Sequence, residues 1–200
     1  MSRYEPIVVS LRHVAIGAET VPVIVTPRLT LRPMAGTDVD AFIDAAPGSH
    51  QPGLLAAAPG RQELELMRAM FAEEWAAHGL GYFLVFENPE PMPIGHVRLK
   101  SIPRSSGEEK TVEVIYGIDA PFQGRGFAKE AVAGALFFAF EVAGVMLAMA
   151  CVEPDHLASL AVALDHGFRG VAIGVVHGIR MHRLFLKRED WRQQPSAMRA

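Results

Sequence analysis

The sequence has one cysteine, no run of basic residues longer than two, and no cysteine–histidine spacing typical of a metal site. The lone Cys151 cannot form a disulfide within the chain, so a hydrophobic core must hold the fold together. It lies in an apolar run, where we expect a buried structural thiol rather than a nucleophile. The 19 basic residues are scattered and the formal net charge is -3, which argues against a nucleic-acid-binding protein.

Signals for membranes or export are also scarce. The first residues show no basic segment followed by an apolar core and a small-residue cleavage site, so no secretory signal is predicted. Residues 131–152 are apolar apart from Glu141, which would lie near the centre of a membrane span of about 20 residues. We expect instead a buried helix that ends near Gly144 and then a buried strand. This indicates a cytoplasmic protein without membrane contact.

With 200 residues, half of them hydrophobic, the chain can form about one domain with a substantial core. Residues 1–25 are expected to be an N-terminal extension with two β-rich pieces, either an added strand or a loose arm. Residues 26–190 form the predicted domain, and residues 191–200 a C-terminal tail.

Hydrophobic periodicity predicts the first elements of the domain. A half-buried strand at 29–32 precedes a helix capped by Thr37 or Asp38, and a longer helix at 61–78 ends at Gly79. The segment 47–60 between them is rich in glycine and proline and is predicted to be a loop, and loops of this length are often functional lids or mobile segments. Three strands joined by short links then predict an antiparallel meander. They span residues 82–87, 94–101 and 111–118.

A glycine-rich turn follows and opens a helix expected at about 126–143. The strand after it, 145–152, is apolar on both faces, which is typical of parallel pairing. The next helix is expected to be capped by Asp155 and to end at Gly167. Two strands near 171–176 and 179–187 close the chain, with a turn that includes His177 and Gly178.

The turn from Gln123 to Ala128 has the properties of a pyrophosphate site. Gly124 and Gly126 permit unusual backbone angles and let a ligand approach the chain closely. The first amides of a helix have no partner within the helix, and the helix dipole adds positive potential there. Arg125 could add a screened contact to a phosphate. The alternative interpretation is a helix start without a ligand.

The pattern Gln123-x-x-Gly126-x-Ala128 resembles the Q/R-x-x-G-x-G/A motif of the GNAT superfamily of acyl-CoA N-acyltransferases. Neighbouring segments resemble the Rim-type branch, which acetylates the N-termini of ribosomal proteins. These segments are residues 26–32, 93–95, 113–118, 129–131 and 166–168, so the resemblance covers roughly residues 26–187. It implies an α+β fold with about seven strands in a mixed, mostly antiparallel sheet, splayed at the acetyl-CoA site and covered by helices on both faces.

The resemblance also implies cofactor-binding residues. Backbone amides of Gly124, Arg125, Gly126, Phe127 and Ala128 would hold the pyrophosphate of coenzyme A. The side chain of Gln123 would brace the loop and the cofactor. The backbone of Ile118 would face the acetyl and pantetheine end, in the slot between two splayed strands.

Two residues are candidates for catalysis under this resemblance. Glu113, on the strand that leads to the motif, could act as the base that deprotonates or orients the amine; a salt-bridged surface glutamate is the alternative. Ser159 matches the serine of the family's N-x-x-S pattern, and its hydroxyl could reach the cofactor sulfur. His156 stands where the family has asparagine and could still hydrogen-bond the cofactor. The family's usual tyrosine is missing from residues 160–164, and solvent could protonate the thiolate instead.

The expected reaction is transfer of an acetyl group from acetyl-CoA to a primary amine, by direct attack in a ternary complex and without a metal. The acceptor is a small amine or a protein N-terminus, decided by loop 47–60 and the hairpin near His177. Arg28 and Arg32 read as surface charges. Two other classes stay open: a non-catalytic acyl-CoA-binding regulatory module, and an interaction domain without a coenzyme A site. A homodimer is also left open.

Overall fold

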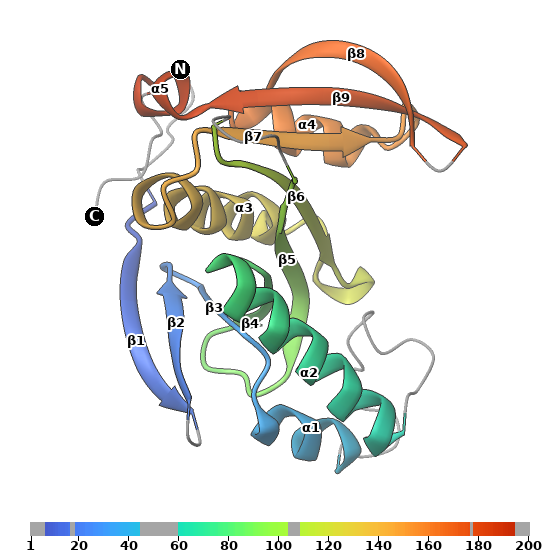
Figure 1. Ribbon diagram of the computed structural model, residues 1–200. Coiled ribbons are helices and arrows are strands. Elements are labelled where there is room, and N and C mark those ends of the chain that lie inside the picture. Colours follow the sequence, from blue (N-terminus) through green and yellow to red (C-terminus); the bar gives the residue numbers. More distant parts are fainter. Residues whose placement is uncertain (1–6, 17–18, 45–59, 104–108, 177, 195–200) are drawn as a thin grey trace.

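The computed structural model describes residues 7–16, 19–44, 60–103, 109–176 and 178–194. Within these residues, nine strands form one sheet in the order β1-β2-β3-β4-β5-β6-β7-β9-β8 (Figure 1). The strands are β1 (Ser10–Ile16), β2 (Glu19–Val25), β3 (Leu29–Arg32), β4 (Tyr82–Glu87), β5 (Pro93–Ser101), β6 (Thr111–Ile118), β7 (Leu147–Val152), β8 (Arg169–Val176) and β9 (Ile179–Lys187). The mixed, mostly antiparallel sheet confirms the expected fold class, with nine strands instead of about seven.

The helices follow the predicted order. They are α1 (Gly36–Ile43), α2 (Arg61–His78), α3 (Phe127–Phe137), α4 (Leu157–Asp165) and α5 (Arg188–Arg192), with a 3-10 turn η2 (Ala120–Phe122) and a π-helical turn η3 (Phe138–Val142). None of the helices in the described part of the chain combines the length and hydropathy that crossing a bilayer requires.

The two extra strands come from the N-terminal segment. β1 pairs antiparallel with β2, and β2 pairs antiparallel with β3. Val9 and Ile24 are buried in the same core as the helix α3. Of the two expectations for this segment, the structure therefore shows added strands of the sheet rather than a loose arm.

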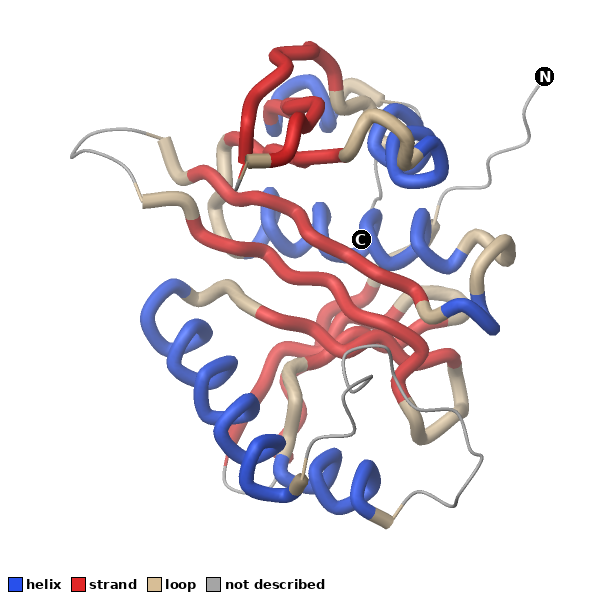
Figure 2. The backbone as a smooth tube through the Cα atoms, turned by 90° about the vertical axis from the view of Figure 1, so that its right-hand side faces the viewer, coloured by secondary structure: helices blue, strands red, loops and turns tan. Residues whose placement is uncertain are grey.

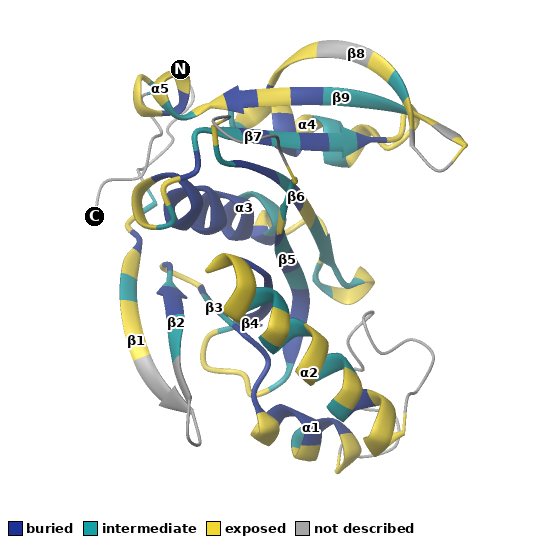
Figure 3. Cartoon of the chain, viewed as in Figure 1, coloured by how far each residue is buried: buried dark blue, intermediate teal, exposed yellow. Residues whose placement is uncertain are grey.

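Helices cover both faces of the sheet, as Figure 2 shows with the helices above and below the strands. On β4, Phe83 and Val85 belong to the core under α3, whereas Leu84 and Phe86 pack with the helices α1 and α2. Alternate residues of one strand therefore serve two separate cores. Figure 3 shows α3 buried along most of its length, while α2 exposes its outer side.

Two expected helix caps differ in the structure. Helix α1 begins after Ala35, and Asp38 lies one turn inside, where its carboxylate accepts the amide of Ala35 at 2.7 Å. Helix α4 has His156 rather than Asp155 at its N-cap. In both cases the predicted cap was placed one or more residues off, because several polar residues stand close together at these helix starts.

The strand β7 pairs parallel with β6 over three residue pairs, from Thr111 with Leu147 to Glu113 with Met149. Beyond Glu113 the two strands share no further pairs, so the expected splay is present. On the other side of β6, pairing with β5 continues to Gly95 opposite Ile118. A side chain at Gly95 would bring its Cβ within 3.0 Å of the Cα of Ile118. The burial of β7 alternates between buried and half-buried residues, so it is not buried on both faces as expected.

The predicted loop 47–60 lies outside the described residues except for Gly60, and His177 of the last hairpin lies outside them as well. Gly178 beside it has a φ of 82°, a left-handed conformation that suits a tight turn.

Candidate active site

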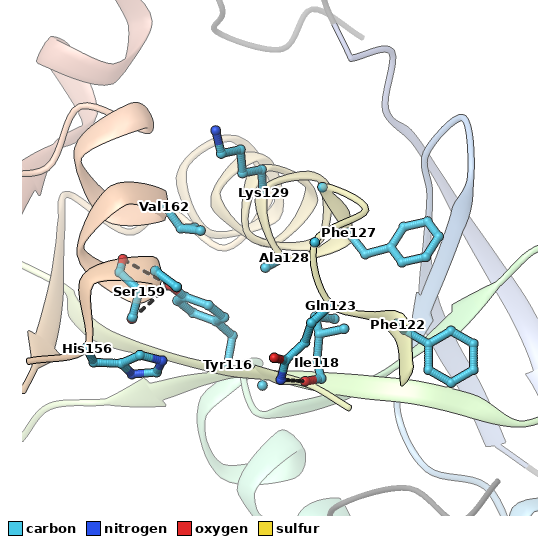
Figure 4. A pocket seen from close by; sticks show the side chains of 14 residues that line it. Tyr116, Ile118, Phe122, Gln123, Phe127, Ala128, Lys129, His156, Ser159 and Val162 are labelled. Atoms are coloured by element: carbon cyan, nitrogen blue, oxygen red, sulfur yellow. Dashed lines mark hydrogen bonds between the residues drawn. The ribbon is translucent and has the colours of Figure 1, made fainter. Parts of the chain in front are cut away.

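A cavity of about 460 Å³ opens where β6 and β7 separate. Its lining residues come from the end of β6, the glycine-rich turn, the first turn of α3 and the start of α4 (Figure 4). The structure gathers eight sequence-predicted site residues there. They are Ile118, Gln123, Gly124, Gly126, Phe127, Ala128, His156 and Ser159.

The glycine-rich turn exposes backbone amides to this cavity. Gly124 and Gly126 have φ angles of 73° and 82°, which are left-handed values that favour glycine. Gly126 is the N-cap of α3, and no side chain there bonds the helix amides. A Cβ at Gly124 would have no heavy atom within 4 Å, so the chain is open to a close ligand at this point. Free amides at a helix N-terminus are suited to an anion.

Gln123 binds the end of strand β6. Its Nε2 donates a 2.7 Å hydrogen bond to the carbonyl oxygen of Ile118, five residues earlier in the chain. This bond closes the turn and fixes the distance between the strand end and the glycine-rich loop. It fits the expected bracing role of Gln123.

Arg125 lies in the loop but is not among the residues that line the cavity. Its guanidinium group bonds Glu87 on β4, with 2.5 Å between Nη2 and Oε1. The guanidinium groups of Arg28 and Arg125 lie 4.7 and 4.5 Å from the ring centroid of Phe127. The ring points away from the cavity in Figure 4. The described geometry thus gives Arg125 a role in holding the loop.

The loop is also fixed by Arg28, which the sequence analysis treated as a surface charge. Arg28 donates from Nε to a carboxylate oxygen of the buried Glu130 at 2.6 Å and from Nη1 to the carbonyl of Arg125 at 2.9 Å. Glu130 also accepts the hydroxyl of Thr26 at 2.7 Å. Arg32 is likewise no free surface charge, since it pairs with Asp38 at 2.6 Å.

Tyr116 is a cavity residue that the sequence analysis missed. Its hydroxyl lies 2.9 Å from Oγ of Ser159 and donates to the carbonyl of Ser159 at 3.2 Å. Burial raises the pKa of this phenol, and the hydrogen bond from Ser159 acts in the opposite direction. The available signal was strand alternation, because Tyr116 shares a face with Ile118.

Two further contacts hold α4 against α3. Lys129 forms an ion pair with Asp165. The ring nitrogen Nε2 of His166 lies 2.9 Å from the carbonyl oxygen of Lys129, to which it donates. Burial lowers the pKa of His166 to about 4, so the ring is neutral at pH 7. His156, at the start of α4, is exposed and lines the cavity.

Glu113 lies on the opposite face of β6 from Tyr116 and Ile118, because it is an odd number of residues away from each. It does not line the cavity, and its carboxylate is 3.7 Å from the ammonium of Lys100. Cys151 on β7 is half-buried and hydrogen-bonds Glu113. Burial, and then the charge of Glu113, raise the pKa of Cys151 to about 11, so the group is a thiol at neutral pH.

Across the described residues, no group of three or more His, Cys, Asp or Glu side chains could hold a metal ion. The site offers backbone amides for an anion, a phenol with a serine partner, and a carboxylate on the far side of the sheet. Because Glu113 points to the other face, strand β6 itself lies between this carboxylate and the cavity.

A family model described as an acetyltransferase (GNAT) domain matches residues 28–169. Among curated protein sequences nothing matches significantly. Many solved structures share the fold. RimJ from Mycobacterium smegmatis in complex with CoA-disulfide has a TM-score of 0.67 at 17% identity, covering 96% of this chain and 90% of that chain.

Two other similar structures differ in what they act on. The ribosomal-protein alpha-N-acetyltransferase RimL has a TM-score of 0.65 at 16% identity, covering 87% of this chain and 97% of its own. A chimera based on the spermidine N-acetyltransferase of Vibrio cholerae has a TM-score of 0.60 at 16% identity, covering 84% and 99%. At these identities the likeness shows the fold.

Proposed function

The chain belongs to the GNAT acetyltransferase family and is an acetyl-CoA-dependent acetyltransferase, and we propose that it transfers the acetyl group to a primary amine by direct attack in a ternary complex. The observation that carries the proposal is the turn with free amides and two left-handed glycines at the mouth of the splayed strands. Acetyl-CoA is the co-substrate, and its pyrophosphate would accept hydrogen bonds from the amides of residues 124–128.

The shape of the cavity supports this placement. It runs from the amides of the turn to the end of β6, so a chain bound by its pyrophosphate can extend its other end toward Ile118. The carbonyl of Ile118 accepts a hydrogen bond from the side-chain amide of Gln123. The strand end is therefore held in place before any ligand arrives, which favours binding of an extended pantetheine chain.

The amine would approach from the other face of the sheet. Glu113 lies on that face and forms, with Met149, the last residue pair that β6 shares with β7. A carboxylate there can accept the proton of an ammonium group, directly or through water, before the amine attacks the thioester. Lys100 at 3.7 Å keeps Glu113 next to a positive charge. Ser159 lines the cavity on the other side of β6, toward which the sulfur end of the co-substrate would extend.

The acceptor class is proposed from chemistry and from the similar structures together. Both a protein N-terminus and a polyamine present a primary amine. We propose a protein N-terminus as the first candidate, because two of the described neighbours are ribosomal-protein acetyltransferases or their Rim relatives. A small amine is the second candidate, because a spermidine N-acetyltransferase chimera is also among the similar structures.

Calorimetric titration with acetyl-CoA tests the binding step. Gly126→Glu would place bulk and negative charge against the pyrophosphate and should abolish the micromolar binding expected for the wild type. Gly144→Glu is the matched control, since Gly144 also has a left-handed φ, of 68°, and a Cβ there meets nothing within 4 Å. If the wild type shows no binding, the acetyltransferase proposal fails.

Thiol release from acetyl-CoA then tests the acceptor. An alanine-initial peptide and spermidine are the two probes, each at the same concentration. Faster release with the peptide supports a protein N-terminus, whereas faster release with spermidine supports a small polyamine.

A further inference from the structure

Tyr116 joins strand β6 to helix α4 across the cavity. The ring comes from the free end of β6, and its hydroxyl contacts Ser159 in the first turns of α4 (Figure 4). Both residues line the cavity and both are half-buried. The phenol therefore lies in the cavity, between the end of β6 and the start of α4.

The phenol proton of Tyr116 is held by one long hydrogen bond. The carbonyl of Ser159 can only accept, so the phenol donates to it, over a rather long 3.2 Å. The hydroxyl of Ser159 is then free to donate to the phenol oxygen at 2.9 Å. A bond donated to that oxygen stabilises negative charge on it once the proton has left. The pair is thus arranged as a proton donor with a partner that supports its anion.

The acidity of the group also fits. An ordinary phenol titrates near pH 10 and an ordinary alkyl thiol near pH 8.5, so transfer of a proton from a phenol to a thiolate is uphill by only about 1.5 pKa units. Burial raises the pKa of Tyr116, which keeps it protonated at neutral pH. The other hydroxyl in the cavity, that of Ser159, is a much weaker acid.

We propose that Tyr116 is the catalytic residue that protonates the departing thiolate of coenzyme A, with Ser159 as its positioning residue. The inference rests on the proposed function. When the tetrahedral adduct collapses, the carbon–sulfur bond breaks and its electron pair stays on sulfur. The phenol proton moves to that sulfur and gives the thiol of coenzyme A. The phenolate, held by the Ser159 hydroxyl, is protonated again by solvent water after the thiol leaves.

Binding of coenzyme A and of desulfo-coenzyme A, which lacks the sulfur, tests the contact without any acceptor. The wild type should bind coenzyme A about 3- to 10-fold more tightly than the desulfo analogue, as one hydrogen bond contributes. Tyr116→Phe keeps the ring and removes the hydroxyl, so this variant should bind the two ligands with about equal affinity. Tyr82→Phe is the matched control, because Tyr82 is a buried tyrosine on β4 that stacks on Phe71 and is absent from the cavity lining.

Thiol release with the better of the two amine probes gives the second readout. Tyr116→Phe should lower kcat about 100-fold, within the range for loss of a general acid, with KM for acetyl-CoA unchanged within about twofold. If the wild type binds neither coenzyme A nor its analogue, the proposed function fails and this inference with it. If the wild type binds and Tyr116→Phe keeps the preference for coenzyme A, only the role of Tyr116 is overturned.

Discussion

Arg28 and Glu130 are 102 residues apart in the chain, and Nε of Arg28 lies 2.6 Å from a carboxylate oxygen of Glu130. The carboxylate is buried, whereas half of the Arg28 side chain is exposed. Through the carbonyl of Arg125, the same guanidinium also reaches the glycine-rich turn. One ion pair therefore connects the start of β3, the first turn of α3 and the loop that faces the cavity.

Glu130→Ala should lower the free energy of unfolding by roughly 2 to 4 kcal/mol. It removes a buried carboxylate that accepts hydrogen bonds from the hydroxyl of Thr26 and the amide of Arg28. Urea denaturation measures the change. Glu141→Ala is the control, since Glu141 pairs with Arg192 near the surface and should cost less than about 1 kcal/mol. Equal losses in the two variants would contradict a special role for the buried pair.

Gln123→Ala should weaken acetyl-CoA binding about 3- to 10-fold, because the carbonyl of Ile118 loses its donor and the strand end is no longer held to the turn. Gln123→Glu should weaken binding further, since a carboxylate would face both that carbonyl and the pyrophosphate. Calorimetric titration measures both. Gln194→Ala removes a similar bond to the carbonyl of His166 and should leave the affinity unchanged. Unchanged binding in Gln123→Ala would show that the turn holds its shape without the bond.

Glu113→Gln should reduce kcat/KM for the amine about 100-fold at neutral pH, as expected for loss of a general base. The affinity for acetyl-CoA should not change, because Glu113 lies outside the cavity on the other face of β6. Steady-state kinetics and calorimetry measure the two quantities separately. Glu189→Gln, an exposed carboxylate on α5, serves as the control. Full activity of Glu113→Gln would contradict a catalytic role and leave Glu113 a strand residue in an ion pair with Lys100.

His166 should make the protein less stable in acid. Its folded-state pKa is about 4, below the usual 6.5. As the pH falls from 6.5 to about 4, His166 becomes protonated in the unfolded chain but stays neutral in the folded chain. The free energy of unfolding therefore decreases over this range. The contribution is fully present above pH 6.5 and amounts to roughly 3 kcal/mol in total.

Urea denaturation between pH 7 and pH 4.5 checks this slope. His166→Gln keeps a donor for the carbonyl of Lys129 but cannot titrate, so its stability should depend less on pH than that of the wild type. Other groups contribute equally to both proteins. Parallel curves for the two proteins would rule out His166 as the source.

The sequence predicted those parts of the fold that depend on local pattern. The strands from Tyr82 to Ile118 and the helix α2 follow from alternation, helical spacing and the glycine after His78. The cofactor loop could be located because a glycine-rich turn between a strand and a helix is a local feature. Parallel pairing of β6 with β7 was predicted correctly, although β7 is not buried on both faces, the property on which the prediction was based.

Long-range partners could not be predicted in the same way. The roles of Arg28 and Glu130 depend on contact across 102 residues, which no local spacing indicates. Tyr116 could not be predicted from the family's pattern, which has its tyrosine in the last helix, because only the fold brings the end of β6 against α4. The N-terminal strands were ambiguous, since short apolar pieces give no information on what they pair with.

Gly95 has a consequence for how the slot opens. The chain of β5 lies so close to Gly117 and Ile118 that only a residue without a side chain fits at this position, and this close approach lets β5 pair with the end of β6. The separation from β7 is part of the sheet's pairing pattern, since β6 stays paired with β5 up to Ile118 after its pairing with β7 has ended at Glu113. Binding of an acyl-CoA then does not require these strands to separate, and such preorganisation favours affinity. A bulky residue at this glycine would shift the strand and disturb a preorganised opening that no cavity residue can restore.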